Sequence, residues 1–197
     1  MVKEVDLSQV YIEAAYHDHT LQLASEIVTR NQSGNVWLIG GSVFRRIVSA
    51  LYGTPMAIGT DYDFIVENPI TPQLPSEWKT ELNHYGNTKL IGPSIDGASQ
   101  IKIDYIPITN ISSIIRRGLS PTVENLLTGT PLTIQSIAYH LNSQTVVGDI
   151  GMASIRSRLV AVNDVQEATD YASKKNLSLT DLVTRMSSSL GFTAQSP

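Results

Sequence analysis

The sequence has no cysteine, which excludes a disulfide scaffold, a thiolate metal site and a cysteine nucleophile. Charged residues are also scarce, at 16% of the 197 residues, and the formal net charge is −4. A global positive field that would attract nucleic acid is therefore excluded. Contact with RNA would need a local basic patch, and each arginine pair that could supply one equally fits a solvated surface. The candidate pairs are Arg45-Arg46, Arg116-Arg117 and Arg156 with Arg158.

Long apolar runs are missing as well. No stretch approaches the roughly 18 apolar residues of a membrane span, and the first 20 residues lack the apolar centre of a signal peptide. We therefore expect a cytoplasmic protein that has no contact with a membrane. Hydrophobic residues still make up 42% of the chain, enough for the core of a folded domain.

The spacing of apolar and turn-forming residues predicts an α/β (α+β) protein with a small, mixed, mostly antiparallel sheet and packed helices. Predicted helices cover residues 12–30, 43–51, 76–82, 110–117, 121–127, 133–141, 166–175 and 179–190. Predicted strands cover 36–39, 61–67, 88–91 and 100–106, with a turn region at 92–97 and a hairpin-like pair at 146–147 and 155–162.

Gly40-Gly41-Ser42 lies where the first predicted strand gives way to a helix. Two residues without Cβ let a phosphate approach the main chain, and a helix N-terminus offers free N–H groups to it. Ser42 is predicted to cap the helix and to donate a further hydrogen bond. The pattern predicts a triphosphate-binding turn, with Arg45 and Arg46 as further nucleotide-binding candidates. It is neither a P-loop nor a dinucleotide fingerprint.

Asp61 and Asp63 share one face of the next predicted strand, because residues two apart on a strand point to the same side. Tyr62 and Phe64 would then pack into the core. Two adjacent carboxylates repel each other, and a bound cation removes that cost. Oxygen ligands suit magnesium, so the pair predicts two Mg²⁺ ions roughly 4 Å apart, with Mn²⁺ as a possible substitute.

Asp104 is the candidate for a third carboxylate ligand. It alternates with Ile103 and Tyr105, which are expected to face the core, so its side chain would lie on the polar side of a neighbouring strand. Lys102 shares that side and could pair with the carboxylates or contact a phosphate. His17-Asp18-His19 is not predicted to bind metal, because residues two apart on a helix point in different directions; a solvated helix is expected there.

In this order, the elements resemble the head domain of the polymerase-beta-type nucleotidyltransferases, and more narrowly the tRNA nucleotidyltransferase (CCA-adding) and bacterial poly(A) polymerase family. The resemblance covers about residues 35–192. Its matching segments are Gly40-Gly41-Ser42-Val43, Gly53-Thr54-Pro55, Asp61-Tyr62-Asp63, Asp104, and Leu132 to Tyr139, which is similar to the family's Phe-Thr-Ile-Asn-Ala-x-Ala-Tyr.

The chain also departs from this family. Gly129, Thr130 and Pro131 stand where the family has the Arg-Arg-Asp that contacts the nucleotide, and Phe44-Arg45 replaces its Arg-Asp. The Glu-Asp-x-x-Arg element that selects the incoming base has no match.

The resemblance implies a nucleotidyltransferase fold, divided into a head domain at 1–163, a short helical neck-like appendage at 164–192 and a frayed tail at 193–197. It also implies a metal-dependent enzyme that moves a nucleoside monophosphate from an NTP to an acceptor hydroxyl. Asp61, Asp63 and Asp104 would bind the metals and carry catalysis. The acceptor could be a tRNA-like RNA 3′ end, a protein or a small molecule, and a partner chain could supply the missing arginines. The alternative is a catalytically inactive binding or assembly module with the same fold.

Overall fold

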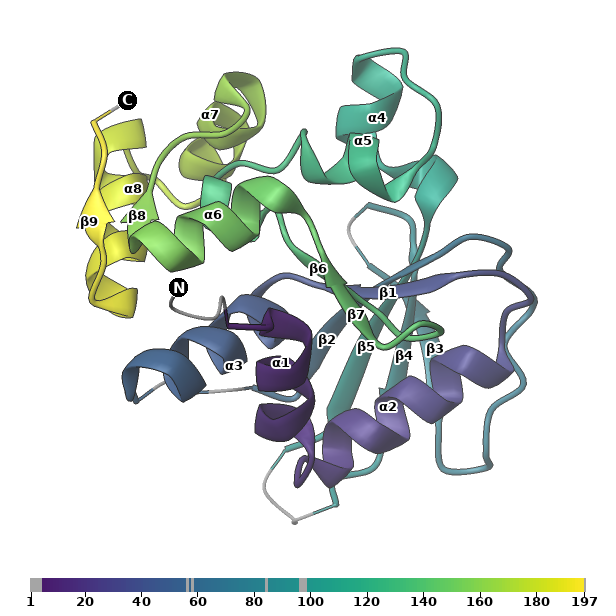
Figure 1. Cartoon of the computed structure of the whole chain (residues 1–197). Helices are drawn as coiled ribbons and strands as arrows, with labels where there is room; N and C mark the ends of the chain where they lie inside the picture. Colours follow the sequence, from purple (N-terminus) through teal and green to yellow (C-terminus); the bar gives the residue numbers. More distant parts are fainter. Residues whose placement is uncertain (1–4, 56, 58, 84, 96–98, 197) are drawn as a thin grey trace.

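The structure is a computed structural model that describes residues 5–55, 57, 59–83, 85–95 and 99–196. Seven strands form one sheet in the order β3-β4-β5-β2-β1-β6-β7 (Figure 1). The strands are β1 Val36–Ile39, β2 Asp61–Val66, β3 Lys79–Leu82, β4 Thr88–Gly92, β5 Ile101–Pro107, β6 Ala138–His140 and β7 Thr145–Val147. Within this sheet β2 and β5 run parallel and the other neighbours antiparallel, which confirms the predicted mixed, mostly antiparallel sheet.

Helices surround the sheet. They are α1 Leu7–Ala15, α2 His19–Arg30, α3 Gly41–Tyr52, α4 Ser112–Arg116, α5 Val123–Leu127, α6 Asp149–Ser157, α7 Val165–Lys174 and α8 Leu179–Leu190. A second, two-stranded sheet pairs β8 Leu159–Val160 with β9 Thr193–Ala194 in parallel. Within the described residues, no helix is both long and apolar enough to cross a bilayer.

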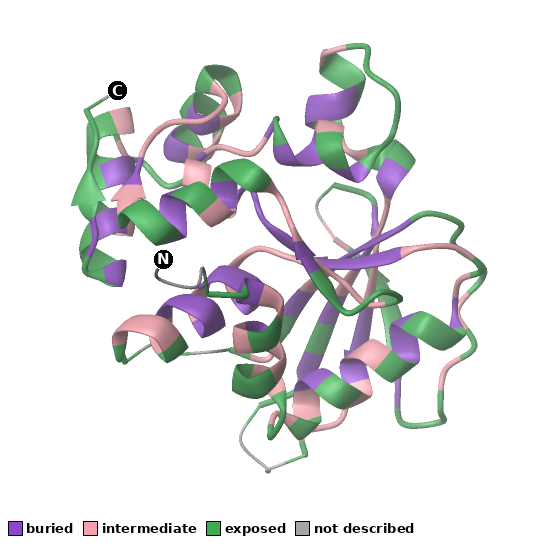
Figure 2. Cartoon of the chain, viewed as in Figure 1, coloured by how far each residue is buried: buried purple, intermediate pink, exposed green. Residues whose placement is uncertain are grey.

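Two apolar clusters hold the layers together, one on each face of the large sheet. The larger cluster includes Tyr62, Phe64 and Tyr105 and lies under α1, α2 and α3 (Figures 1 and 2). The smaller one places Ile65 and Trp37 under α4 and α5. Because side chains alternate along a strand, Asp61 and Asp63 share the face of Ile65. The carboxylates thus lie on the α4–α5 side of the sheet.

The predicted helix 12–30 is wrong in its middle, because the chain breaks there into α1 and α2. Asp18 is the reason: its Oδ1 accepts a hydrogen bond from the Leu21 N–H at 2.8 Å, so it caps the start of α2. An aspartate capping a helix satisfies an amide that would otherwise lack a partner. Asp18 therefore begins a helix and does not lie within one.

Two other predicted helices are strands in the structure. Within 76–82, residues Lys79–Leu82 form the edge strand β3, which pairs with β4. Within 133–141, a 3₁₀ turn at Thr133–Gln135 is followed by β6, which hydrogen-bonds to both β1 and β7. In both cases pairing with distant strands decides the conformation, and local spacing of apolar residues does not report such partners.

The predicted hairpin-like segment 155–162 is also wrong in part, since α6 extends to Ser157 and only Leu159–Val160 is a strand. That strand pairs with β9, so Thr193 and Ala194 are hydrogen-bonded residues and not a frayed end. Pro197 and residues 96 and 97 of the predicted turn lie outside the described residues. The division into a head and a neck-like appendage stays a prediction.

Candidate nucleotide-binding and metal-binding site

Gly40 joins β1 to α3 and brings the turn against a carboxylate. Its φ of 72° and ψ of −151° fall in a region that only glycine occupies readily. Ile39, just before it, lies opposite Asp63 in the antiparallel pair of β1 and β2. A Cβ placed on Gly40 would lie 3.3 Å from Asp63 Oδ2. The glycine turn and this carboxylate therefore form one continuous surface.

The first turn of α3 points its amide groups toward the same region. Gly40 is the N-cap, and the amides of Gly41 and Ser42 are the ones that helix geometry leaves without an intrahelical acceptor. Ser42 does not cap the helix as predicted. It is buried inside the first turn, and its hydroxyl faces the Asp61 carbonyl oxygen at 3.5 Å. The serine thus ties α3 to the start of β2.

Asp63 and Asp104 are brought together by strand register. They are directly opposite each other in the parallel pair of β2 and β5, so both carboxylates stand on the same face of the sheet. Ile103 and Tyr105, on either side of Asp104, are buried in the core as predicted. The prediction that these two acidic residues converge is therefore confirmed.

Asp104 has two partners that the sequence analysis did not identify. Asn83 Nδ2 donates to Asp104 Oδ1 at 3.0 Å, and Lys89 Nζ lies 3.5 Å from Asp104 Oδ2. Lys89 stands opposite Asp104 in the antiparallel pair of β4 and β5. Lys89 lies within the predicted strand 88–91, next to the consecutive apolar residues Leu90 and Ile91, so no alternation marks it as a site residue. Its register with Asp104 could not be derived from the sequence.

The environment of Asp63 disfavours its charged form. Burial contributes most, followed by the charge of Asp104 and a hydrogen bond with that carboxyl, and together they raise the pKa of Asp63 to about 6. Asp61 adds a smaller effect in the same direction, whereas the Lys89 ammonium opposes the shift. A carboxylate held in this way is stabilised by any cation that approaches it.

The donor set suits a hard divalent cation, although the third ligand is not in place. Asp63 and Asp104 offer carboxylate oxygens in contact with each other, the ligand type that Mg²⁺ and Mn²⁺ prefer. Asp61 shares their face but is exposed at the start of β2. Within the described ranges, no three His, Cys, Asp or Glu side chains gather into a ready-made metal site. The pair fits a cation, and Asp61, on the same face, adds negative charge near Asp63.

Arg46 points away from this site. Its side chain is 1% exposed, forms an ion pair with Asp18 and donates from Nη1 to the Ser42 carbonyl at 2.6 Å. Tyr62, on the core face of β2, contacts the same pair, and burial raises the pKa of its hydroxyl to about 12. The predicted role of Arg46 as a nucleotide contact does not fit this placement. Asp18, expected to be solvated, is instead its partner.

Arg45 and Lys102 remain beside the site. The Arg45 side chain folds back over Gly41, where an added Cβ would lie 3.2 Å from its Nε. It therefore lies near the free amides of α3. Lys102 is exposed and stands opposite Asp61 in the pair of β2 and β5. Arg45 is thus next to the glycine turn, and Lys102 is next to Asp61.

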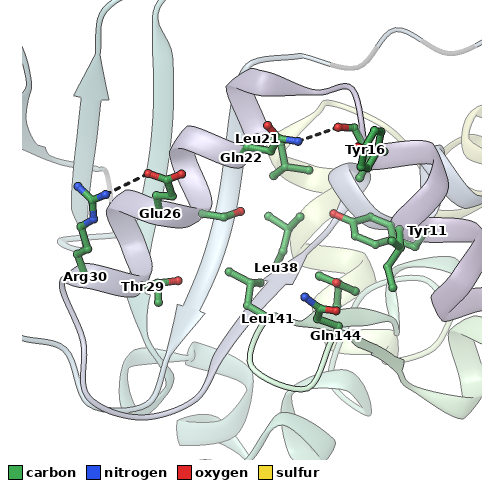
Figure 3. Close-up of a pocket in the computed structure, with 14 residues that line it drawn as sticks. Tyr11, Tyr16, Leu21, Gln22, Glu26, Thr29, Arg30, Leu38, Leu141 and Gln144 are labelled. Carbon is green, nitrogen blue, oxygen red and sulfur yellow. Dashed lines mark hydrogen bonds and ion pairs between the residues drawn. The ribbon is translucent and has the colours of Figure 1, made fainter.

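A groove of the described residues lies elsewhere. It has a volume of about 540 Å³ and lies between α1, α2 and the sheet, with Tyr11, Leu38 and Leu141 among its lining residues (Figure 3). Leu38 belongs to the core on the opposite face from Asp63. The carboxylates and the glycine turn do not line this groove. The candidate site therefore lies on the other face of the sheet from this groove.

Solved structures with a similar fold are known. No family model matches the chain, and no curated protein matches it by sequence. A structure of a CCA-adding enzyme with CTP aligns with a TM-score of 0.62 over 98% of this chain at 15% identity. A tRNA-processing enzyme with CTP aligns with a TM-score of 0.50 over 89% of this chain at 14% identity. The chain spans 44% and 43% of those two proteins.

At these identities the likeness concerns architecture. The chain has a nucleotidyltransferase fold that resembles the head domain of tRNA nucleotidyltransferases, which confirms the fold predicted from the sequence resemblance.

Proposed function

We propose that this protein is a metal-dependent nucleotidyltransferase that moves a nucleoside monophosphate from an NTP to an acceptor hydroxyl. The observation that carries the proposal is the contact of Asp63 with Asp104 directly beside the Gly40 turn. Carboxylates suited to a divalent cation and amides suited to phosphate are neighbours in the structure. The fold, shared with proteins solved with CTP, supports the same proposal.

The proposed roles follow from position. Gly40, Gly41 and the amide of Ser42 hold the β- and γ-phosphates, with Arg45 above Gly41 as a further contact. Asp61 and Asp63 hold the cations that orient the triphosphate, and Asp104 holds the one near the acceptor. When bound, Mg²⁺ neutralises charge on the reacting phosphate and lowers the pKa of the acceptor hydroxyl.

In the reaction, the acceptor oxygen bonds to the α-phosphorus, and the bond from that phosphorus to the bridging oxygen of pyrophosphate breaks. The acceptor proton passes to Asp104 or, through it, to solvent. Positioning and charge neutralisation account for most catalysis in phosphoryl transfer, so three carboxylates suffice without a dedicated base. An RNA 3′ end, a protein or a small molecule could provide the hydroxyl; the net charge of −4 gives RNA no general attraction.

A second function is favoured by a specific observation. Both oxygens of Asp104 already have partners, Asn83 and Lys89, and Arg46 is buried away from the site. This arrangement also suits a catalytically inactive module that binds a nucleotide without converting it, or that binds a partner chain.

Calorimetric titration of each NTP, with and without Mg²⁺, separates the two functions. If the protein is an enzyme, NTP binding should depend on Mg²⁺ and should be lost in Asp63→Asn. The circular dichroism of this variant should remain that of the folded protein. Binding that is indifferent to both Mg²⁺ and the substitution would favour the inactive module.

A further inference from the structure

Lys89 forms an ion pair with a carboxylate of the candidate site. It rises from β4 directly opposite Asp104, and its ammonium lies 3.5 Å from Asp104 Oδ2. Both side chains are partly buried, with 26% of Lys89 and 21% of Asp104 exposed. The lysine also acts on Asp63, because its charge lowers the pKa of that carboxyl. The Lys89 ammonium therefore interacts with two of the three carboxylates, those of Asp104 and Asp63.

A divalent cation and this ammonium compete for Asp104 Oδ2. Mg²⁺ binds a carboxylate oxygen at about 2.0–2.1 Å, and an ammonium at its present distance would repel it strongly. The other oxygen, Oδ1, is held by Asn83 Nδ2. Asn83 is itself fixed, since its Oδ1 accepts from the amides of Tyr85 and Asn87, each at 3.0 Å. Asn83 thus fixes the orientation of the Asp104 carboxyl group. Oδ2 is the oxygen at which a metal ion would replace the Lys89 ammonium.

We propose that Lys89 is the resident counter-ion of Asp104 and that it is exchanged for the divalent cation when the site is loaded. The inference rests on the proposed function, since it concerns the same three carboxylates. Because the lysine is flexible and its strand is fixed, the displaced ammonium stays within reach of the site. A bound triphosphate offers it a new anionic partner, so metal binding becomes coupled to nucleotide binding. Lys89 thereby weakens binding of metal alone.

The test is direct binding of Mn²⁺, measured without nucleotide by calorimetry and by the Mn²⁺ electron paramagnetic resonance signal. Lys89→Met should bind Mn²⁺ at least about tenfold more tightly than the natural protein, because a partly buried competing charge is gone. Lys89→Arg keeps the charge and should bind like the natural protein. Lys79→Met removes a lysine that pairs with Glu81 on the edge strand and should change the affinity by less than about twofold.

The coupling is tested by repeating the titration with a non-hydrolysable NTP present. The advantage of Lys89→Met should shrink, because the natural protein then gains a phosphate partner for the displaced ammonium. If Lys89→Met binds free Mn²⁺ no more tightly than the natural protein, the exchange is wrong while the proposed function stands. If neither protein binds Mn²⁺ with or without nucleotide, the exchange and the metal-dependent function both fail.

Discussion

Asp63 on β2 and Asp104 on β5 face each other across a parallel strand pair, with Lys89 as the cation that acts on both. Folding places these like charges in contact although repulsion and burial oppose it. The cost is visible in the pKa of Asp63, which is raised to about 6. A fold retains such a pair most readily where a ligand of opposite charge is bound during function.

The first prediction concerns stability against pH. The pKa of Asp63 is higher in the folded protein than its ordinary value of 3.8, so the folded state holds this proton more tightly than the unfolded state. The stability that this proton contributes is complete below about pH 4 and is lost as the pH rises through about 6. The loss amounts to at most about 3 kcal/mol. Urea unfolding between these pH values measures it.

Asp63→Asn should remove that loss, so the variant should be more stable than the natural protein at neutral pH. Added Mg²⁺ should stabilise the natural protein there and leave the variant nearly unchanged, since a ligand stabilises the state that binds it. If the free energy of unfolding of the two proteins changed with pH in the same way, this account of Asp63 would be contradicted.

The second prediction concerns the glycine turn. Gly40→Ala forces a side chain into a backbone region that costs about 1–3 kcal/mol and puts a methyl group 3.3 Å from Asp63 Oδ2. We expect NTP binding to be lost, because the methyl group covers the approach to the main chain. Gly53→Ala is the matched control: its φ is 66° but nothing lies within 4 Å of the added Cβ. It should cost about 1–2 kcal/mol and leave NTP binding intact.

The third prediction concerns the buried ion pair. Arg46→Met should lower the free energy of unfolding by about 2–4 kcal/mol, because it leaves Asp18, which is 25% exposed, without its partner and frees the Ser42 carbonyl. Arg45→Met, one position earlier on α3, should cost less than about 1 kcal/mol. Chemical unfolding of both variants measures the two changes in the free energy of unfolding. Equal effects would mean that Arg46 does not hold α3 against the N-terminal helices.

Local patterns predicted the parts of the site that depend on neighbouring residues. The alternation in 61–66 and 101–107 placed the acidic side chains opposite their buried neighbours, and the glycine pair predicted the turn after β1. These features repeat at the period of one strand or one turn, so a single segment carries the information. The fold class and the face on which each carboxylate lies were therefore accessible from the sequence, whereas the contact of Asp63 with Asp104 depends on the register of β2 and β5.

Features that depend on contacts between distant segments were not accessible. Lys89 meets Asp104 only through the register of β4 and β5, and Arg46 meets Asp18 only because α1 packs on α3 and Asp18 follows α1. The spacing of apolar residues predicts helices where the edge strand β3 and strand β6 form. Pairing with neighbouring strands overrides that local preference. Ser42 was mistaken for a cap because glycine can also hold that position.

The most direct test of the central claim is transfer of label from each α-phosphate-labelled NTP in the presence of Mg²⁺ and total cell extract. The account predicts that label moves to one class of acceptor, that pyrophosphate is released in equal amount, and that Asp63→Asn and Asp104→Asn abolish both while remaining folded. Transfer that persists in those two variants, or the absence of transfer with any NTP by the natural protein, would contradict it.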